Sequence, residues 1–513
     1  MISAAGAKAL DAEASANWGL NSFALVEAAG RACAMAFCRA FPQEPRSFAV
    51  LAGKGNNAAD ALIMLKALIL DGYAQSSVCL VVTPQVTAMA DLAAEKNPLS
   101  EAMLAVRKMG VPVMKWDGAE AAAIAHTLTH YDVIIDGITG TGSTGPLRDT
   151  ALEMMEAVMG HPYIVSIDIP SGNYDGWQVG LPMIAARATL AIEPQKLCLY
   201  APSARPYAGD IIPVGGVFPP ALIEQYREAE LVAWEAAAAK IAPVAPTAYK
   251  YERGVVEIRA GSTGAAGAAR LAALGAQAAG AGLVRLIVDP SLYPVIAPAC
   301  SGVMVTPGED GSAANSRFSP NAVLLGPGWG RGEDRWRLLE TYVPREKSGL
   351  PLVLDADAIA LAKDMTFNGN ALLTPHPGEF AAYTGLSKEA ILNDPIPALR
   401  RQAHEKNVYI LLKSHVLYAA SPDGRIGIID GMKAALAAGG SGDMLAGFCA
   451  AMAARNAASA RKPFDGYACA CAAASLLIQA AKSDGVAGSF FDPAELARPA
   501  AAIAGAAWLP AEV

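Results

Sequence analysis

A glycine-rich turn followed by a single carboxylate is the stretch of this sequence most suited to chemistry. Residues 434–447 read AALAAGGSGDMLAG, and Asp443 is the one charged side chain among small and apolar neighbours. Glycines ahead of a helix let a ligand approach the backbone, and the amides at the helix start attract anions. A carboxylate there suits a base that takes a proton from a hydroxyl, which then attacks a phosphoryl group held by the turn. An Asp that caps the helix is the structural alternative, and the motif alone does not separate the two.

The composition is that of an apolar, weakly acidic protein. The chain has 513 residues, of which 53% are hydrophobic and 17% charged, and its net charge is −8. The length predicts two or three domains, and an acidic balance without a basic run argues against nucleic-acid binding. The eight cysteines include no CxxC pair and have no His at zinc spacing, so we interpret them as reduced residues of a cytoplasmic protein.

Neither export nor membrane insertion is expected. The N-terminal segment places Asp11 and Glu13 where a signal peptide needs an unbroken apolar run. Residues 434–454 are long and apolar enough to span a bilayer, but glycines interrupt them and Asp443 lies near their centre, where lipid would disfavour it. A helix buried against a sheet is the interpretation that we favour.

Both halves alternate short apolar strands with helices, which is typical of a parallel sheet covered by helices on both faces. In the first half, strands are expected at 47–53, 76–83, 132–138 and 163–169, and helices at 59–72 and 101–110. In the second half, strands are expected at 322–326, 352–357, 371–374 and 408–413, and a helix of small residues at 265–282. A charged stretch with a Pro/Ala end separates the halves, so we predict domains at 1–225 and 249–513 and a linker at 226–248. Ligands of such sheets bind at the carboxyl ends of the strands.

The second half resembles the ADP/ATP-dependent NAD(P)H-hydrate dehydratases, which have a ribokinase-like fold. GGSGDMLAG is similar to the GGTGDVLAG of that family, and LLTPHPGEF to its LTPHPGEF. Further segments match in the family's order, and these are YKYERG, GSTGAAGAARLAALGAQAAGAGLV, LLGPGWGR and VLDADAIALA.

The first half resembles the NAD(P)H-hydrate epimerase domain that precedes the dehydratase in a bifunctional bacterial fusion. LAGKGNNAADALIM is similar to GxGNNGGDGLV, DVIIDGITGTGSTGPLR to DALFGTG…RPL, and VSIDIPSGNYDG to VDIPSGLDADTG. The resemblance covers nearly the whole chain. It implies two three-layer αβα domains, of which the N-terminal one is Rossmann-like and the C-terminal one ribokinase-like.

The resemblance implies the repair of NADH and NADPH that carry water at carbon 6 of the nicotinamide ring. The epimerase interconverts the R and S hydrates, and the dehydratase removes water from the S form at the expense of ADP or ATP. Phosphorylation makes the hydroxyl a good leaving group, which joins a kinase-like site to an elimination. The implied cofactors are potassium in the epimerase domain and magnesium with the nucleotide in the dehydratase domain. The hydrates and the nucleotide are the expected partners, in a homo-oligomer that binds neither membranes nor nucleic acid.

In the dehydratase domain, the resemblance makes Asp443 the catalytic base. The positions that match substrate-binding residues are Ala268, Gly328 and His376, and those that match nucleotide-binding residues are Lys413, Ser414, His415, Gly440, Ser441 and Gly442. The family's LKGxxT reads LKSHVL at 412–417, which predicts an altered nucleotide contact. Asp355 and Asp357 either orient magnesium-bound water or end a strand, and Glu379 is expected to cap the next helix.

In the epimerase domain, the resemblance makes Asp168 the proton-handling residue. The substrate-binding positions are Asn56, Asn57, Asp60, Gly140, Thr141 and Gly142, and the potassium ligands are Asn57, Asp136 and Ser171, whose oxygens suit a hard monovalent ion. The family's GNNGGDG reads GNNAADA at 55–61. If any of the three alanines needed a positive φ angle, each would cost roughly 1 kcal/mol or more, and the domain would then be structural rather than active.

Rival functions remain open at this stage. A ribokinase-like small-molecule kinase would share the fold and GGSGD but lack TPHPGEF and the epimerase-like half. A nucleotide-sensing protein with a decayed site is favoured by the altered LKSHVL and GNNAADA segments and opposed by Asp443 and His376. A dehydratase whose epimerase domain is inactive is the remaining alternative.

Overall fold

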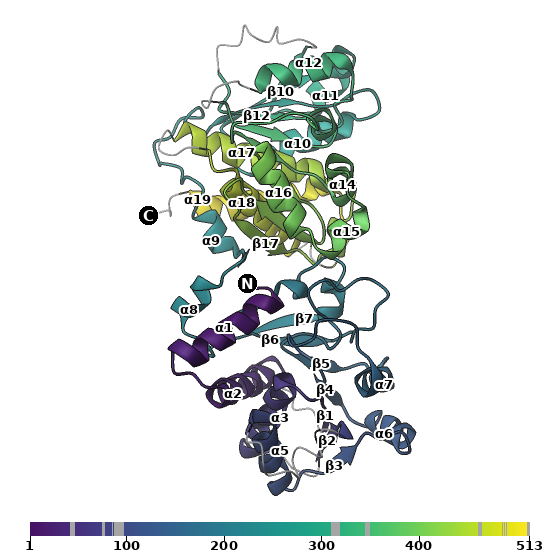
Figure 1. Cartoon of the computed structure of the whole chain (residues 1–513). Helices are drawn as coiled ribbons and strands as arrows, with labels where there is room; N and C mark the ends of the chain where they lie inside the picture. The colour runs from purple at the N-terminus through teal and green to yellow at the C-terminus, as the bar shows by residue number, and fades with distance from the viewer. Residues whose placement is uncertain are drawn as a thin grey trace. The chain divides into compact units, whose positions relative to one another are not determined.

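The computed structural model describes residues 1–41, 47–73, 77–84, 86, 97–308, 319–343, 349–459, 464–484, 486, 488 and 490–509. The chain forms two compact units, Met1–Ala229 and Glu230–Val513. Each unit has a largely parallel sheet between layers of helices (Figure 1). The prediction of two αβα domains is therefore confirmed.

The first unit contains a seven-stranded, wholly parallel sheet in the order β3-β2-β1-β4-β5-β6-β7. Its strands are β1 Phe48–Ala52, β2 Val78–Val82, β3 Val113–Lys115, β4 Val133–Gly137, β5 Ile164–Ile167, β6 Ala188–Ile192 and β7 Asp210–Val214. The chain order reverses between β1 and β4, which pair from Phe48–Val133 to Ala52–Gly137. Such a reversal opens a crevice at the carboxyl ends of the two strands.

Helices cover both faces of this sheet because alternate residues of each strand point to opposite sides. Val50 and Leu80 pack with one group of helices, and Leu51 and Val81 with the other. The first group is α1 Ala4–Asn17, α2 Ser22–Ala40, α3 Asn56–Leu70, α5 Pro98–Lys108 and α8 Pro220–Gln225. The second group is α6 Ala121–Leu128 and α7 Asp149–Val158.

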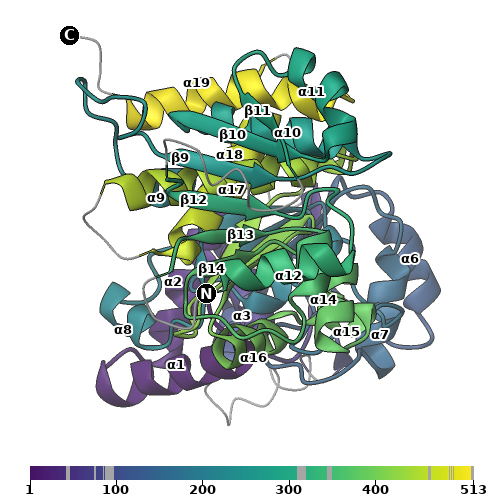
Figure 2. The same cartoon turned by 90° about the horizontal axis from the view of Figure 1, so that it is seen from above.

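The second unit contains a ten-stranded sheet in the order β11-β10-β9-β12-β13-β14-β15-β16-β17-β8. Its strands are β8 Glu230–Leu231, β9 Val255–Arg259, β10 Leu283–Val288, β11 Met304–Pro307, β12 Ala322–Leu325, β13 Leu352–Leu354, β14 Ala371–Leu373, β15 Tyr409–Leu412, β16 Val416–Ala420 and β17 Ile426–Asp430. Only the pairings of β16 with its two neighbours are antiparallel among the described strands. Figure 2 shows β11, β10, β9, β12, β13 and β14 following one another across the sheet, with the reversal between β9 and β12.

One face of this sheet packs on helices built largely from alanine. These are α9 Trp234–Ala238, α10 Ala266–Ala278, α11 Tyr293–Ala299, α17 Ser441–Ala458, α18 Gly466–Ala481 and α19 Ala497–Trp508. The remaining helices are α12 Glu333–Tyr342, α13 Asp357–Leu361, α14 Pro377–Thr384, α15 Lys388–Asn393 and α16 Ile396–Lys406. Those that connect β12, β13, β14 and β15 belong to the other face, as right-handed crossovers require after the reversal.

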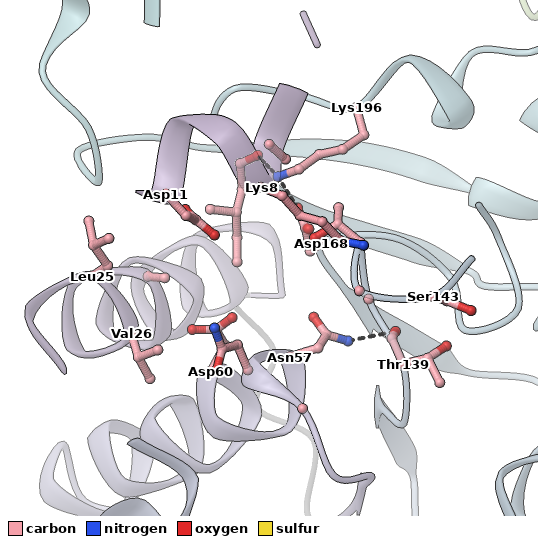
Figure 3. A pocket seen from close by; sticks show the side chains of 18 of the residues that line it. Lys8, Asp11, Leu25, Val26, Asn57, Asp60, Thr139, Ser143, Asp168 and Lys196 are labelled. Carbon is pink, nitrogen blue, oxygen red and sulfur yellow. Dashed lines mark hydrogen bonds and ion pairs between the residues drawn. The ribbon is translucent and has the colours of Figure 1, made fainter. Parts of the chain in front are cut away.

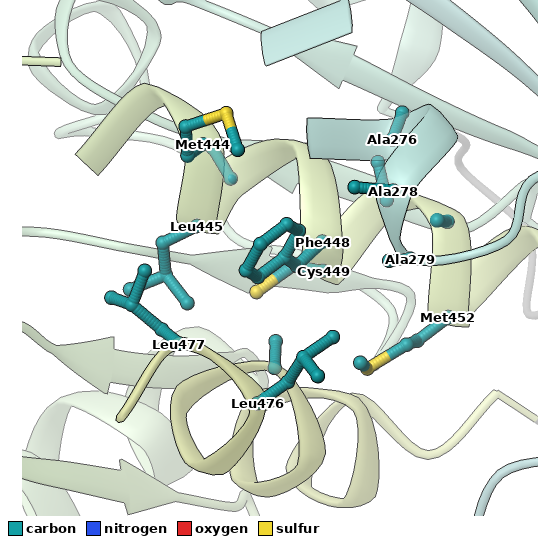
Figure 4. Packing of buried hydrophobic residues seen from close by; sticks show 14 of the residues in the cluster. Ala276, Ala278, Ala279, Met444, Leu445, Phe448, Cys449, Met452, Leu476 and Leu477 are labelled. Atoms are coloured by element: carbon teal, nitrogen blue, oxygen red, sulfur yellow. The ribbon is translucent and has the colours of Figure 1, made fainter. Parts of the chain in front are cut away.

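Small residues allow α10 and α17 to pack closely. A Cβ on Gly275 would lie 2.4 Å from the carbonyl oxygen of Met444, and one on Gly447 would lie 2.2 Å from that of Ala272. Figure 4 shows Phe448 and Leu445 of α17 filling the space towards Leu476 and Leu477 of α18. This packing accounts for the alanine-rich composition. Among the described residues, no helix combines the length and hydropathy needed to cross a membrane.

Most predicted elements match the structure within a few residues, although residue 76 of one predicted strand lies outside the described residues. The apolar segment 434–454 differs, because α17 begins only at Ser441. Ala434–Leu436 forms a separate 3-10 turn, and Gly440 takes a φ of +104° that ends any helical path through it.

The predicted linker is partly a structural element of the second unit. The division between units lies between Ala229 and Glu230, inside 226–248. β8 pairs with β17, and the side chains of Ala237, Ala238 and Ile241 are buried in the core of the second unit. The apolar residues of this segment thus find a buried surface within the unit that follows them.

Candidate active sites

Asp443 lies in the first turn of α17, at the carboxyl-end side of the second sheet. Gly440 occupies the N-cap position, and no side chain caps the helix. The alternative in which Asp443 is the N-cap is therefore wrong, and the first turn of the helix has no side chain over its amides that would compete with an anion. Burial raises the pKa of Asp443 to about 6, with further raising by Asp355 and Glu379 and lowering by Lys413. A carboxylate of this pKa is ionised at neutral pH and can accept a proton.

Lys413 follows β15 and forms an ion pair with the buried Asp355, which follows β13. Its Nζ donates to Asp355 Oδ1 at 2.6 Å, and Thr374 Oγ1 donates to the same oxygen at 2.7 Å. Burial lowers the pKa of Lys413, but Asp355, Glu379 and Asp443 together raise it above the ordinary value. The side chain is therefore an ammonium, and its Nζ lies 3.3 Å from the point where a Cβ of Gly442 would stand. Lys413 thus joins the strand ends to the glycine turn.

Asp357 is the first residue of α13, and its carboxylate binds the GPGWGR turn that follows β12. Its Oδ2 accepts a hydrogen bond from the backbone N–H of Gly330 at 2.8 Å, and its Oδ1 one from Arg331 Nε at 2.8 Å. Asp355 and Asp357 are therefore both bonded to groups from neighbouring loops.

Two of the predicted substrate positions, Ala268 and Gly328, lie against one another. Gly328 has a φ of +56°, and a Cβ added to it would lie 2.6 Å from the Cβ of Ala265 and 3.1 Å from that of Ala268. Ser262 Oγ donates to the carbonyl of Gly328 at 2.8 Å. The loops after β9 and β12 thus meet at the reversal of strand order. Only glycine fits at position 328, because any Cβ there would clash with Ala265.

His376 and Glu379 form a capping box at the start of α14. His376 Nδ1 accepts from the N–H groups of Gly378 at 3.0 Å and Glu379 at 3.2 Å, and Glu379 Oε2 accepts from the N–H of His376 at 2.8 Å. The expected capping by Glu379 is confirmed. Because Nδ1 is an acceptor, the neutral ring carries its proton on Nε2, and the His376 side chain is 57% exposed. His376 is therefore a structural residue that still presents a donor to solvent.

The hydroxyls of the predicted nucleotide segment are turned towards their own backbone. Ser414 Oγ donates to the carbonyl of Val416, and Ser441 Oγ donates to that of Leu436 at 2.8 Å. The carbonyl of His415 accepts from the N–H of Gly431 at 3.0 Å, and the His415 residue is exposed. The N–H of Ser441 donates to the carbonyl of Ala438 at 3.3 Å, so a phosphate at this turn would meet the backbone amides of Gly440 and Gly442 rather than serine side chains.

The first unit has a cavity of about 760 Å³ at the carboxyl ends of its central strands. Every predicted substrate-binding residue of this unit lines it together with Asp168, namely Asn56, Asn57, Asp60, Gly140, Thr141 and Gly142. Figure 3 shows these loops around the space between α1, α2 and α3. The cavity lies at the reversal between β1 and β4, as the sequence predicted for a ligand of such a sheet.

Asp168 is held in an unusual backbone conformation beside Lys196. Its φ is +64°, and its Oδ1 accepts from Lys196 Nζ at 2.7 Å. Lys196 also donates to the carbonyl of Ile192 at 3.0 Å, and both side chains are buried. A positive φ outside glycine marks a position that its surroundings hold under strain. Sequence reasoning missed Lys196, for which only its place after an apolar strand was a signal.

The three predicted potassium ligands belong to one hydrogen-bond network. Asn57 Nδ2 donates to the carbonyl of Thr139 at 2.9 Å, and Ser171 Oγ lies 3.2 Å from the same oxygen. Ser171 Oγ donates to Asp136 Oδ1 at 2.5 Å, and Ser166 Oγ to Asp136 Oδ2 at 2.7 Å. The network gathers amide, hydroxyl, carbonyl and carboxylate oxygens, a donor set that fits a hard monovalent ion. In the described part of the chain, no group of three or more His, Cys, Asp or Glu is placed to hold a metal.

The alanines of GNNAADA do not occupy strained positions. Ala58, Ala59 and Ala61 lie in α3, they are fully buried, and none has a positive φ. Gly137 accommodates the methyl group of Ala61, whose Cβ lies 2.7 Å from where a Cβ of Gly137 would stand. The backbone cost considered from the sequence does not arise, because the helix begins at Asn56 and already includes these residues.

Two family models match the chain. One is described as NAD(P)H-hydrate dehydratase and matches residues 256–490, and the other is described as YjeF-related protein N-terminus and matches residues 22–198. The bifunctional NAD(P)H-hydrate repair enzyme Nnr of Salinibacter ruber is 30% identical over 489 residues, which cover 89% of this chain and 88% of that protein. The protein of the same name from Escherichia coli K12 is 29% identical and covers 89% of this chain and 84% of its own length.

A solved structure also matches about half of the chain. It is the ADP/ATP-dependent NAD(P)H-hydrate dehydratase from Bacillus subtilis, co-crystallised with ATP and Mg²⁺. The identity is 25%, the match covers 54% of this chain and 97% of that chain, and the TM-score is 0.48.

Proposed function

The chain belongs to the family of bifunctional NAD(P)H-hydrate repair enzymes, and from this premise we propose that it repairs hydrated NADH and NADPH. The first unit interconverts the R and S hydrates, and the second removes water from the S hydrate at the expense of ADP or ATP. The observation that carries the proposal is Asp443, a carboxylate of raised pKa in the uncapped first turn of α17 beside the Lys413 ammonium.

Asp443 takes the proton of the hydrate hydroxyl, whose oxygen then attacks the terminal phosphoryl group of the nucleotide. We assign the turn formed by Gly440, Ser441 and Gly442 to the transferred group, and Lys413 adds a positive charge next to Gly442. The phosphate then leaves with the ring-carbon oxygen, and a proton is lost from the adjacent carbon as the ring double bond reforms. Ala268, Gly328 and the exposed Nε2 of His376 are the substrate contacts that we assign.

Magnesium bound to the nucleotide would neutralise charge on its phosphates. The carboxylates that interact with Asp443 are Asp355 and Glu379, and they are the described side chains that we assign to water around such an ion. Ser414 and His415 follow Lys413 at the nucleotide side of the site, where backbone groups supply the contacts.

In the first unit we assign proton transfer to Asp168 and substrate contacts to the loops at Asn56–Asp60 and Gly140–Gly142. Potassium is assigned to Asn57, Asp136 and Ser171. Substituting sodium for potassium should then slow the conversion of the R hydrate to the S hydrate, and Asp168→Ala should reduce it to the spontaneous rate. An R hydrate that converts equally fast without the protein would show that this unit is structural.

Product analysis distinguishes the proposal from a small-molecule kinase of the same fold. The whole chain is incubated with the S hydrate of NADH, magnesium, and either ADP or ATP. We expect NADH absorbance to return with one phosphate released for each NADH formed. A phosphorylated hydrate that accumulates without NADH absorbance would contradict the dehydratase proposal and support a kinase.

The cytoplasmic location and the homo-oligomer remain predictions. Light scattering on the whole chain measures the oligomeric state directly.

A further inference from the structure

Asp60 is a buried carboxyl group with an unsatisfied oxygen. The residue is 9% exposed and lines the cavity of the first unit. Its Oδ1 is closed off from solvent and receives no hydrogen bond from any described group. An ionised carboxylate at this position would leave Oδ1 without water or a donor, which disfavours the charged form. The side chain is therefore a candidate for a neutral carboxylic acid at the wall of the cavity.

Negatively charged residues around Asp60 also favour its neutral form. Figure 3 shows Asp11 of α1 and Asp168 in the same cavity, with Lys196 bonded to Asp168. Burial raises the pKa of Asp60 well above its ordinary value, Asp168 and Asp11 raise it further, and Lys196 opposes them. On α2, burial raises the pKa of the Cys33 thiol well above its ordinary value, so this neighbour adds no charge. The other charged residues that line the cavity are Lys8, Lys54, Arg148, Asp149 and Glu193.

We propose that Asp60 is the proton donor of the first unit and that Asp168, held by Lys196, is the matching proton acceptor. This inference rests on the proposed epimerase function and goes beyond substrate contact by Asp60. Two carboxyl groups of one cavity that are kept in different protonation states form an acid–base pair. Here the buried lysine is bonded to Asp168, whereas Asp60 has no bonded cation among the described residues.

The pair supplies both proton transfers that inversion of carbon 6 requires. Asp60 gives its proton to the hydroxyl, the C6–O bond breaks with its electron pair on the departing water, and the lone pair of the ring nitrogen forms a C6=N bond. Water then adds to the opposite face of C6, the nitrogen regains its lone pair, and Asp168 takes the proton of the added water. One proton enters and one leaves, so nothing is oxidised or reduced, and proton exchange with solvent restores the starting state.

Asp11 is a positioning residue in this scheme, because it acts on Asp60 through charge. It lies on α1, before the residues 22–198 that match the family model. Burial raises the pKa of Asp11 too, Lys196 lowers it and Asp168 raises it. Removing the Asp11 charge would lower the pKa of Asp60, so the protonated donor would be lost at a lower pH. Asp11→Asn should therefore move the alkaline decline of epimerisation to lower pH.

The first test follows the conversion of the pure R hydrate of NADH to the S hydrate by chromatography, using the whole chain. Asp60→Asn keeps the shape of the side chain but cannot supply a proton, so the turnover rate above the spontaneous reaction should fall about 100-fold or more with little change in KM. Asp71→Asn is the matched control, because Asp71 is the exposed C-cap of the same helix and lies outside the cavity. It should retain the parent rate.

The second test measures protonation without relying on activity. Infrared spectra of the parent and of each variant are recorded at neutral pH, and each variant spectrum is subtracted from that of the parent. The parent minus Asp60→Asn spectrum should contain the C=O band of a carboxylic acid, and the parent minus Asp71→Asn spectrum should not. Absence of the band from the first difference, or an Asp60→Asn protein as fast as an active parent, would overturn the inference. A parent that does not accelerate the reaction at all would instead contradict the epimerase function itself, and the donor role would fall with it.

Discussion

The two units place the same kind of ion pair at their strand ends. In the first unit Asp168, after β5, pairs with Lys196 at 2.7 Å, and in the second Asp355, after β13, pairs with Lys413 at 2.6 Å. Asp168, Lys196 and Asp355 are buried and Lys413 is partly buried. Both pairs lie at the carboxyl ends of parallel strands, where ligands bind. The sheets differ in size and order, yet each fixes an aspartate with an ammonium beside the region we assign to chemistry.

Each unit has a second aspartate near this ion pair, and the two units differ in how deeply that aspartate is buried. Asp60 on α3 is buried without a partner for Oδ1, whereas Asp443 on α17 is only partly buried. Burial and neighbouring carboxylates raise the pKa of Asp60 well above its ordinary value but that of Asp443 only to about 6. Depth of burial thus makes one carboxyl group a proton donor and the other a proton acceptor at neutral pH.

Asp443→Asn gives the largest effect expected from this comparison. Loss of a general base should lower nucleotide-dependent NADH formation by about 10²–10⁴-fold, while epimerisation by the first unit stays at the parent rate. Measuring both activities on one preparation checks this, and equal dehydratase rates in variant and parent would show that Asp443 is not the base.

The stability of the same variant has a definite sign. The folded pKa of Asp443 is raised from 3.8 to about 6, so its ionised form disfavours the folded state, increasingly from about pH 4 and fully above about pH 6. Asparagine removes that charge. The thermal midpoint of Asp443→Asn at pH 7 should therefore equal or exceed that of the parent, and a clear fall would indicate that the carboxylate supports the fold.

Breaking the two ion pairs should give comparable losses of stability in different units. Lys413→Met and Lys196→Met each leave a buried aspartate without its cation, which should lower the free energy of unfolding of the affected unit by about 3 kcal/mol. Hydrogen exchange read by peptide locates the loss. Lys363→Met and Lys108→Met change exposed lysines of the same two units and should have little effect. A loss confined to one of the two pairs would break the parallel between the units.

The smallest effect concerns the alanines of α3. Ala58→Gly and Ala59→Gly restore the family's glycines at helical positions with no positive φ. Each should lower the free energy of unfolding by about 1 kcal/mol, and neither should make epimerisation faster. Chemical denaturation and the R-hydrate assay measure the two quantities. Faster epimerisation in either variant would mean that the alanines do impair the site.

The sequence predicted the two αβα units and the loops that meet at each sheet edge, because apolar strands, glycine turns and ordered motifs are local signals. It also grouped the residues that line the cavity of the first unit. Partner choice was not predicted, since Lys196 and Asp168 are 28 residues apart and Lys413 and Asp355 are 58 apart. Only the register of the strands brings these side chains together.

Other differences have equally physical causes. Asp11 gave no sign of lining the same cavity as Asp60, because its helix α1 is separated from α3 in the sequence by α2 and β1. Residues 226–248 were predicted as a linker because a charged stretch with a Pro/Ala end lies there, yet Ala237, Ala238 and Ile241 are buried in the second unit. The role of Asp443 as an N-cap was an open alternative until the position of Gly440 was known.

The pH dependence of the dehydratase tests the central claim most directly, because it reports the protonation of the base that acts on the hydrate. Single turnovers of the whole chain with the S hydrate of NADH, magnesium and saturating nucleotide are followed by NADH absorbance from pH 5 to pH 8. The rate should rise with pH around a midpoint near 6, as Asp443 loses its proton. A rate that is flat across this range, or that falls as pH rises through 6, would contradict Asp443 as the proton acceptor.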